Sequence, residues 1–236
     1  MQVQVRSRFR FKGPEMEGAV ARWYARLRSS GNQLEQYRKQ AAQLTDGLPA
    51  GAKVLEVAPG PGYLSIEMAR LERVQVTGLD ISHTFVQIAS ENARQAGVDI
   101  DFQQGDAAVM PFDAESFDLI VCQAAFKNFM EPASALDEMY RVLHRGGTAV
   151  IQDMSSEASH ADIEREVRKM QLGWLSSFTT KATLEMLRRR AYSPARFQRL
   201  AAESAFKTCE IKKDGIGLDV RLQKPRMIEQ MERHMN

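Results

Sequence analysis

The residues of this chain best suited to chemistry lie where an apolar run enters a glycine-containing turn. The run ends at Glu56, the turn 58–62 contains Gly60 and Gly62, and Asp80 follows about 20 residues later. A strand that passes through such a turn into a helix brings backbone N–H groups close to a ligand, and the later acid can bind ribose hydroxyls. We therefore expect a site for a cofactor that contains a nucleoside.

Two helices should precede this turn. Apolar residues recur at helical spacing in two stretches: Met16, Val20, Trp23 and Leu27, then Leu34, Tyr37, Ala41 and Leu44. Each stretch predicts a helix with one apolar face. Residues 1–47 are expected to form an amino-terminal helical cap.

After residue 48, strands and helices alternate. The expected strands cover residues 53–58, 74–79, 100–104, 117–122 and 148–153. Ser82 is placed to cap one intervening helix, and Gly146-Gly147 is expected to end another. Alternation of this kind predicts a parallel sheet with helices on both faces. Segment 48–153 is the expected cofactor-binding core.

The last part of the chain breaks the alternation. Asp214-Gly215 joins two strand patterns, 206–213 and 216–222, and is a strong hairpin signal, so the final strand should run antiparallel. We expect one domain over residues 1–236, with a helical lid insertion, a last helix followed by the closing hairpin, and a tail. These three parts cover residues 154–192, 193–225 and 226–236.

These features resemble the class I S-adenosylmethionine-dependent methyltransferases, and most closely the small-molecule enzymes grouped with the ubiquinone/menaquinone C-methyltransferases. The resemblance covers residues 48–153 and, more loosely, continues to Pro225. It rests on the turn 56–62, Asp80, the stretch 105–107 and the R-V-L-H-R-G-G stretch 141–147. It implies an α/β three-layer sandwich of the Rossmann-like methyltransferase fold, with a mostly parallel seven-stranded sheet and an antiparallel last strand.

The resemblance also implies S-adenosylmethionine as the cofactor. Asp80 would hold the ribose hydroxyls, Ile81 would lie beside the adenine, and Asp106 would reach the adenine amino group. The full implied cofactor site is Glu56, Ala58, Gly60, Gly62, Asp80, Ile81, Asp106, Ala107 and Gln123. Two residues depart from the pattern of the family, Ala58 in place of glycine and Arg145 in place of proline. Ser65 stands where a dinucleotide fingerprint would have its third glycine, which argues against NAD.

The loop 123–129 should lie at the carboxyl edge of the sheet, where open α/β folds bind ligands. Gln123 and Asn128 could orient the cofactor or an acceptor oxygen, and Lys127 could offset an acidic group or lie on the surface. These three are the catalytic candidates, and no general base is identified. Catalysis mainly by positioning needs none.

The aromatic residues of the cap and the insertion are candidates for a lid over the acceptor. They are Trp23, Tyr24, Trp174 and Phe178. The alternative is ordinary helix packing, since Ile163, Val167, Met170 and Trp174 keep helical spacing.

Composition excludes several other classes of protein. The formal net charge is only +2, and the loop after the fourth strand lacks the two prolines of amino-methylating nucleic-acid enzymes, so no nucleic-acid partner is expected despite a basic arm at residues 6–12. Cys122 and Cys209 lie in apolar runs away from any histidine cluster, which gives no metal site and no disulfide. The apolar runs are shorter than the roughly 20 residues of a membrane span. We expect a cytoplasmic monomer or homodimer.

The sequence thus predicts S-adenosylmethionine-dependent methyl transfer to a small, apolar or aromatic metabolite. Transfer to carbon, oxygen and nitrogen all stay open. Two alternatives are a protein of the same fold that binds the cofactor without transferring methyl, and an NAD-linked oxidoreductase.

Overall fold

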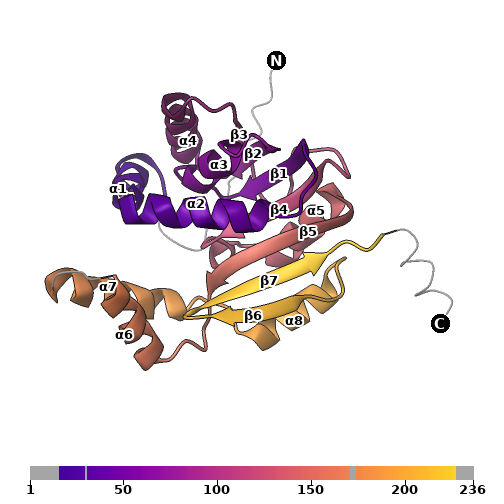
Figure 1. Cartoon of the computed structure of the whole chain (residues 1–236). Helices are drawn as coiled ribbons and strands as arrows, with labels where there is room; N and C mark the ends of the chain where they lie inside the picture. Colours follow the sequence, from indigo (N-terminus) through magenta and orange to yellow (C-terminus); the bar gives the residue numbers. More distant parts are fainter. Residues whose placement is uncertain (1–15, 30, 171–173, 227–236) are drawn as a thin grey trace, which may run out of the picture.

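The computed structural model describes residues 16–29, 31–170 and 174–226, so the basic arm at 6–12 and most of the tail lie outside the described residues. A seven-stranded sheet runs through the molecule in the order β3-β2-β1-β4-β5-β7-β6, with helices on both faces (Figure 1). The strands are β1 (Ala52–Val57), β2 (Val74–Asp80), β3 (Asp101–Gln104), β4 (Phe117–Gln123), β5 (Leu143–Met154), β6 (Glu210–Asp214) and β7 (Gly217–Gln223). Strand β7 runs antiparallel to its neighbours β5 and β6, and the other neighbouring strands pair in parallel. The predicted fold class is confirmed.

Helices cover the two faces of the sheet in separate sets. They are α1 (Gly18–Arg28), α2 (Gly31–Thr45), α3 (Tyr63–Ala69), α4 (His83–Ala96), α5 (Pro132–Val142), α6 (His160–Lys169), α7 (Trp174–Arg188) and α8 (Pro194–Glu203), with a short 3₁₀ turn η1 (Phe126–Asn128). Helices α2 and α3 pack on Val54 of β1, whereas α5 and α8 pack on the side of Leu55. Adjacent residues of β1 therefore enter different cores, which explains its nearly continuous apolar run.

The closing hairpin forms as predicted. Asp214 pairs with Gly217 across the turn, and Leu218, Val220 and Leu222 are buried on one face of β7. The preceding strand β6 begins only at Glu210, because Phe206 packs into the core beside α5 and α8 instead of pairing in the sheet.

The junction between α5 and β5 differs from the prediction. The helix ends at Val142, and β5 begins directly at Leu143 instead of at Thr148. The register against β4 shifts between Phe117 and Leu119, so the two glycines lie within an irregular strand. A side chain on Gly147 would place its Cβ 2.9 Å from the Asp118 carbonyl oxygen, and this close approach explains the glycine better than a helix stop does.

Helix α1 is present as predicted, and its apolar stripe does not pack into the core. Ala21 and Ala25 face the protein, whereas Val20, Trp23 and Leu27 are exposed. Small residues allow α1 to lie close against α4, and the large apolar side chains remain outside.

The start of α1 is tied to the start of α4. The Glu17 carboxylate accepts hydrogen bonds from the backbone N–H and the hydroxyl of Thr84, and the Ser82 hydroxyl donates to the Met16 carbonyl oxygen. The Ser82 hydroxyl also accepts a hydrogen bond from the N–H of Phe85. The first turn of α4 is therefore capped by Ser82, which directly precedes it, and by Glu17, which comes from a distant part of the chain.

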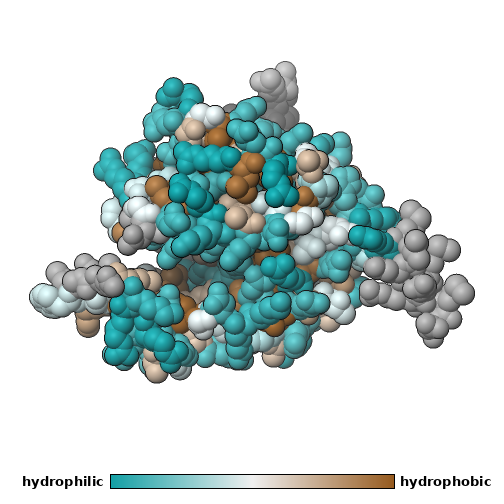
Figure 2. All heavy atoms as spheres, in the orientation of Figure 1, coloured by the Kyte–Doolittle hydropathy of each residue, from teal (hydrophilic) through white to brown (hydrophobic). Residues whose placement is uncertain are grey.

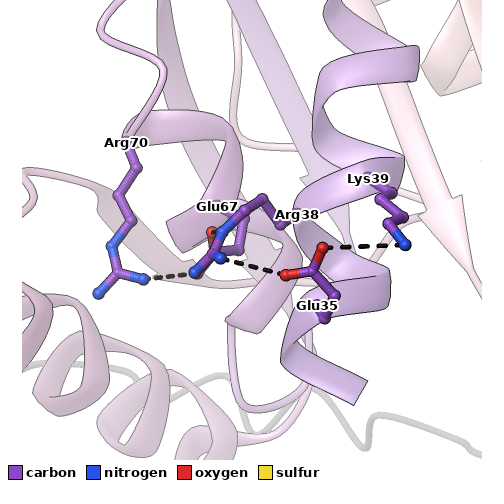
Figure 3. Close-up of polar contacts among 5 residues, drawn as sticks. All are labelled: Glu35, Arg38, Lys39, Glu67 and Arg70. Carbon is purple, nitrogen blue, oxygen red and sulfur yellow. Dashed lines mark hydrogen bonds and ion pairs between the residues drawn. The ribbon is translucent and has the colours of Figure 1, made fainter. Parts of the chain in front are cut away.

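A buried acid fixes α2 over α3. The side chain of Glu67 on α3 is 4% exposed and pairs with Arg70 and with Arg38 of α2. Figure 3 shows Arg38 between Glu67 and Glu35, and Lys39 on the other side of Glu35. These pairs hold α3, which begins at the glycine turn.

The insertion after β5 forms two helices that pack on each other, α6 and α7, at the end of the molecule that also carries α1 (Figure 1). Ile163 and Val167 are buried, whereas Met170 and Trp174 are exposed. The helical face predicted from these four residues therefore becomes core only in its first half.

Two substitutions in the turn after β1 should differ in their effect on stability. Gly62 has φ +78°, and an added Cβ would lie 2.9 Å from Ala89 Cβ and Phe102 Cζ, so Gly62→Ala should cost about 1–3 kcal/mol. Ala58 has φ +58°, so Ala58→Gly relieves strain and should change stability by less than about 1 kcal/mol. Urea unfolding of both variants measures this difference; equal losses would contradict it.

Candidate functional site

Two acids are buried side by side at the carboxyl ends of β1 and β2. Glu56 is 3% exposed and Asp80 is 5% exposed. Asp80 accepts the N–H of Gly60 on one oxygen at 3.0 Å and the N–H of Ser82 on the other at 2.9 Å. The second acid therefore fixes the glycine turn from the neighbouring strand.

Glu56 accepts a hydrogen bond from the Ser65 hydroxyl, and both side chains are buried. Ser65 lies on α3, so this bond joins the helix to β1. Ser65, which stands in place of the third glycine of a dinucleotide fingerprint, thus joins α3 to β1.

Burial raises the pKa of both carboxyl groups. The pKa of Glu56 rises to about 7, although the hydrogen bond from Ser65 opposes the shift. The pKa of Asp80 rises to about 6, although the N–H groups of Ser82 and Gly60 oppose it. Among the described residues, no lysine or arginine pairs with either acid. Each carboxylate oxygen can accept a second hydrogen bond, so the pair fits a ligand that brings hydroxyl groups and positive charge. The residues present therefore fit S-adenosylmethionine.

The turns after β1 and β4 have the same geometry. Ala58 and Ala124 both adopt the left-handed region, with φ of 58° and 57°. The N–H of Ala58 donates to the Leu79 carbonyl and the N–H of Ala124 donates to the Gln152 carbonyl, each at 2.7 Å. Since β1 and β4 are neighbours from which the chain winds outward in both directions, the two turns flank the topological switch point where open α/β sheets bind ligands.

The residues predicted for the adenine lie beside Asp80. Gly105 N–H donates to the Asp80 carbonyl at 2.9 Å, which joins the turns after β2 and β3. Asp106 accepts the N–H of Ala108, Ile81 is half-buried, and Ala107 packs against the larger core. The structure thus brings these predicted residues to one edge; their roles toward the cofactor remain predictions.

Lys127 is not a surface residue, so that alternative is wrong. Its side chain is 5% exposed, and its ammonium donates to Asp153 Oδ1 at 2.7 Å and to the Ala124 carbonyl. Its backbone N–H donates to the other oxygen of Asp153 at 2.9 Å. Lys127 thus secures the strained turn at Ala124 and, in this pairing, offers no free charge to an acceptor.

Asp153 itself was missed by sequence reasoning. The sequence did contain an indication of this residue. Asp153 is the last residue of the predicted strand 148–153, just as Asp80 is the last residue of β2.

Gln123 takes part in a chain of polar side chains across the sheet. Its amide nitrogen donates to Gln40 at 3.0 Å and to Gln152 at 3.3 Å, and the Gln152 amide donates to Asp219 at 2.9 Å. Gln40 and Asp219 come from α2 and β7, and no local pattern marks them. Asn128 is half-buried on η1, and no described residue bonds its side chain.

Three of the four predicted lid residues are open to solvent. Trp23 is 63%, Trp174 84% and Phe178 70% exposed. The ring of Tyr24 packs edge-on against Phe85 and belongs to the contact between α1 and α4. Figure 2 shows a hollow between the body of the molecule and the arm that α6 and α7 form.

Other site types find no support in the described ranges. No three His, Cys, Asp or Glu side chains there are grouped so that they could hold a metal ion. Cys122 and Cys209 are free, and burial raises the pKa of both thiols. Within the same ranges, no helix combines the length and apolarity needed to cross a bilayer.

Comparison with known proteins extends this description. Residues 48–203 match a family described as a methyltransferase domain. Phosphatidylethanolamine N-methyltransferase of Cereibacter sphaeroides is 32% identical over 202 residues, which cover 77% of this chain and 98% of that protein. Demethylmenaquinone methyltransferase of Deinococcus radiodurans is 35% identical over 108 residues, 45% of each chain. The chain spans about half the length of the demethylmenaquinone methyltransferases that it matches.

The fold has solved counterparts. A structure from Methanococcus maripaludis, described as an S-adenosylmethionine-dependent methyltransferase, has a TM-score of 0.68 at 22% identity and covers 93% of this chain and 98% of its own. The matched domain and the nearly full-length relative show that this chain belongs to the family of S-adenosylmethionine-dependent methyltransferases.

Proposed function

We propose that this protein transfers the methyl group of S-adenosylmethionine to a small molecule with long apolar chains, a membrane lipid. The observation that carries the proposal is the pair of buried carboxyl groups, Glu56 and Asp80, at the switch point of the sheet, where no described lysine or arginine pairs with them. Family membership supports the methyl donor. The acceptor class is inferred from the relatives and from the exposed aromatic residues of α1 and α7.

The residues that would hold the cofactor follow from their positions. Asp80 has acceptor capacity left for ribose hydroxyls, and the turn around Gly60 gives a close backbone approach. Glu56 can ionise to balance the positive charge of the ligand. When bound, the cofactor supplies a methyl group on a positively charged sulfur.

The protein's own contribution is positioning and exclusion of water. A fixed approach of two reactants can account for about 7–11 kcal/mol of a barrier. The turns at Ala58 and Ala124 are each held by hydrogen bonds to the neighbouring strand, so they provide rigid walls for such a site. We propose Gln123 at the end of β4 as a residue that orients the ligands.

The names of the relatives support two kinds of lipid as candidate acceptors. The nearly full-length relative is named for N-methylation of phosphatidylethanolamine, and the shorter matches are named for demethylmenaquinone. Both named acceptors carry long apolar chains. The longer match makes an amine head group the first candidate, and a quinone ring carbon is the second.

Transfer of labelled methyl tests this function. The protein is incubated with methyl-labelled S-adenosylmethionine and detergent-dispersed phosphatidylethanolamine, a demethylated quinone or neither. We expect label in one lipid only. Asp80→Ala should bind S-adenosylmethionine and S-adenosylhomocysteine much more weakly and lose transfer, because the ribose loses its acceptor.

Thermal stabilisation provides the control for the donor. A ligand at about 100 times its dissociation constant should add roughly 2.7 kcal/mol to stability, and NAD should add none. Stabilisation by the sulfur nucleosides without label in either lipid would favour a cofactor-binding scaffold. Stabilisation by NAD alone would support the alternative that the protein is an NAD-linked oxidoreductase. The exposed variant Glu210→Gln should behave as the parent protein does.

Glu56 should make the stability of the ligand-free protein depend on pH. Below pH 4.5 the group is protonated in both states, but as pH rises toward 7 the folded state holds on to a proton that the unfolded state releases. Stability should therefore fall over this interval by an amount on the order of 3 kcal/mol, and Glu56→Gln should remove that part of the fall. Urea unfolding from pH 4 to 8, with Glu210→Gln as the control, measures it; a parallel curve for Glu56→Gln would refute the assignment.

The pair of Lys127 and Asp153 should act on the turn after β4 and not on the reaction itself. Lys127→Met leaves a buried carboxylate without its cation and should cost about 3–5 kcal/mol. In Lys127→Met/Asp153→Asn the buried carboxylate is absent, so most of the lost stability should be recovered. This double variant should keep its kcat and show a raised KM for the acceptor. Unfolding curves and steady-state kinetics separate the two effects. A stable double variant without turnover would contradict this prediction and would make the pair part of the catalytic machinery.

A further inference from the structure

Both tryptophans of the chain lie exposed on helices beside the hollow. Trp23 on α1 is 63% exposed and Trp174 on α7 is 84% exposed. Each has apolar neighbours on its own helical face: Val20 and Leu27 at spacings of three and four residues, and Phe178 at four. Solitary exposed apolar residues are ordinary, but groups on one face of two helices mark an interaction surface.

The two helices lie at the same edge of the sheet. The start of α1 is bonded to Thr84, at the start of α4, which follows the carboxyl end of β2. The helices α6 and α7 follow the carboxyl end of β5. Figure 1 shows α1 and α7 at one end of the molecule, and Figure 2 shows the hollow between them. The two helices that carry the exposed apolar faces thus lie at the same end of the molecule as the hollow.

Exposed positive charges lie beside the apolar face of α1 and at the end of α7 opposite Trp174. Arg22 and Arg26 are exposed on α1, and Arg189 and Arg190 are exposed directly after α7. The structure pairs none of the four guanidinium groups with a described carboxylate. By contrast, the arginines and the lysine of α6 pair with acids of their own helix.

We propose that these residues form a docking rim for the surface of a bilayer that contains anionic phospholipids. The docking rim consists of Val20, Trp23, Leu27, Trp174 and Phe178 with Arg22, Arg26, Arg189 and Arg190. Tryptophan and phenylalanine insert at the level of the lipid head groups, and arginines on the same side of the protein bind the negative surface. The inference rests on the proposed function, because a lipid acceptor has to reach the hollow from a membrane.

Charge favours a membrane over the two other occupants of this surface. A second copy of the chain would place one basic rim against another. Closure of α1 onto α7 would leave the exposed Arg22 and Arg26 without a neutralising charge, since neither Trp174 nor Phe178 is acidic. An anionic surface is the occupant that neutralises all four.

Vesicle binding without acceptor or cofactor tests the rim. The full chain is mixed with vesicles of phosphatidylcholine, with and without phosphatidylglycerol, and both sedimentation and tryptophan emission are recorded. We expect binding to the anionic vesicles, with a shift of emission to shorter wavelength because both tryptophans enter the interface. Binding should fall more than tenfold at about 1 M salt, where the Debye length is only about 3 Å.

Variants locate the surface. Arg22→Gln/Arg26→Gln should weaken partition about fivefold for each charge removed, and Trp23→Ala/Trp174→Ala should weaken it at least as much. The matched control is Lys53→Gln/Arg73→Gln, which removes two charges from the opposite edge of the sheet, at the starts of β1 and β2. It should bind vesicles as the parent chain does.

Three outcomes would overturn the docking rim: equal binding to neutral and anionic vesicles, an equal loss in the control variant, or self-association without vesicle binding. Methyl transfer to detergent-dispersed lipid without vesicle binding would refute the rim and leave the proposed function intact. Vesicle binding that depends on the rim, without transfer to any lipid, would refute the function and leave the rim.

Discussion

The site depends on one hydrogen bond, from the N–H of Gly60 to the buried carboxylate of Asp80. It joins the turn after β1 to the end of β2, and the carbonyl of Asp80 extends the link to Gly105 after β3. Three consecutive strand ends are thereby fixed relative to each other. The cost is a carboxyl group held out of water, and its raised pKa reflects that cost.

The fold was readable from the sequence because its signals are local. The apolar run of β1, the cap at Ser82 and the Asp214-Gly215 turn each act over a few residues, and all three appear in the structure as predicted. Predictions failed where contacts between distant segments decide which residues are buried and where an element begins. Periodicity cannot tell which face of α1 is buried, because Ala21 and Ala25 are selected by the close approach to α4, and the start of β5 is set by pairing with Phe117.

The candidate site was readable only in part for the same reason. Glu56 and Asp80 stand in a motif, so their positions follow from the order of strands. Glu17, Gln40 and Asp219 reach the site from distant segments and carry no local signal. Lys127 shows the opposite error: a lysine in a loop suggested solvent, but the acid at the end of β5 gives it a buried partner.

The attachment of α1 through Glu17 couples two distant parts of the chain. The start of this helix is bonded to Ser82 and Thr84, two and four residues after Asp80. The N–H of Ser82 donates to the carboxylate of Asp80, and the N–H of Thr84 donates to the carboxylate of Glu17. A displacement of the start of α1 would therefore break bonds at the first turn of α4 and would act on the turn that follows Asp80.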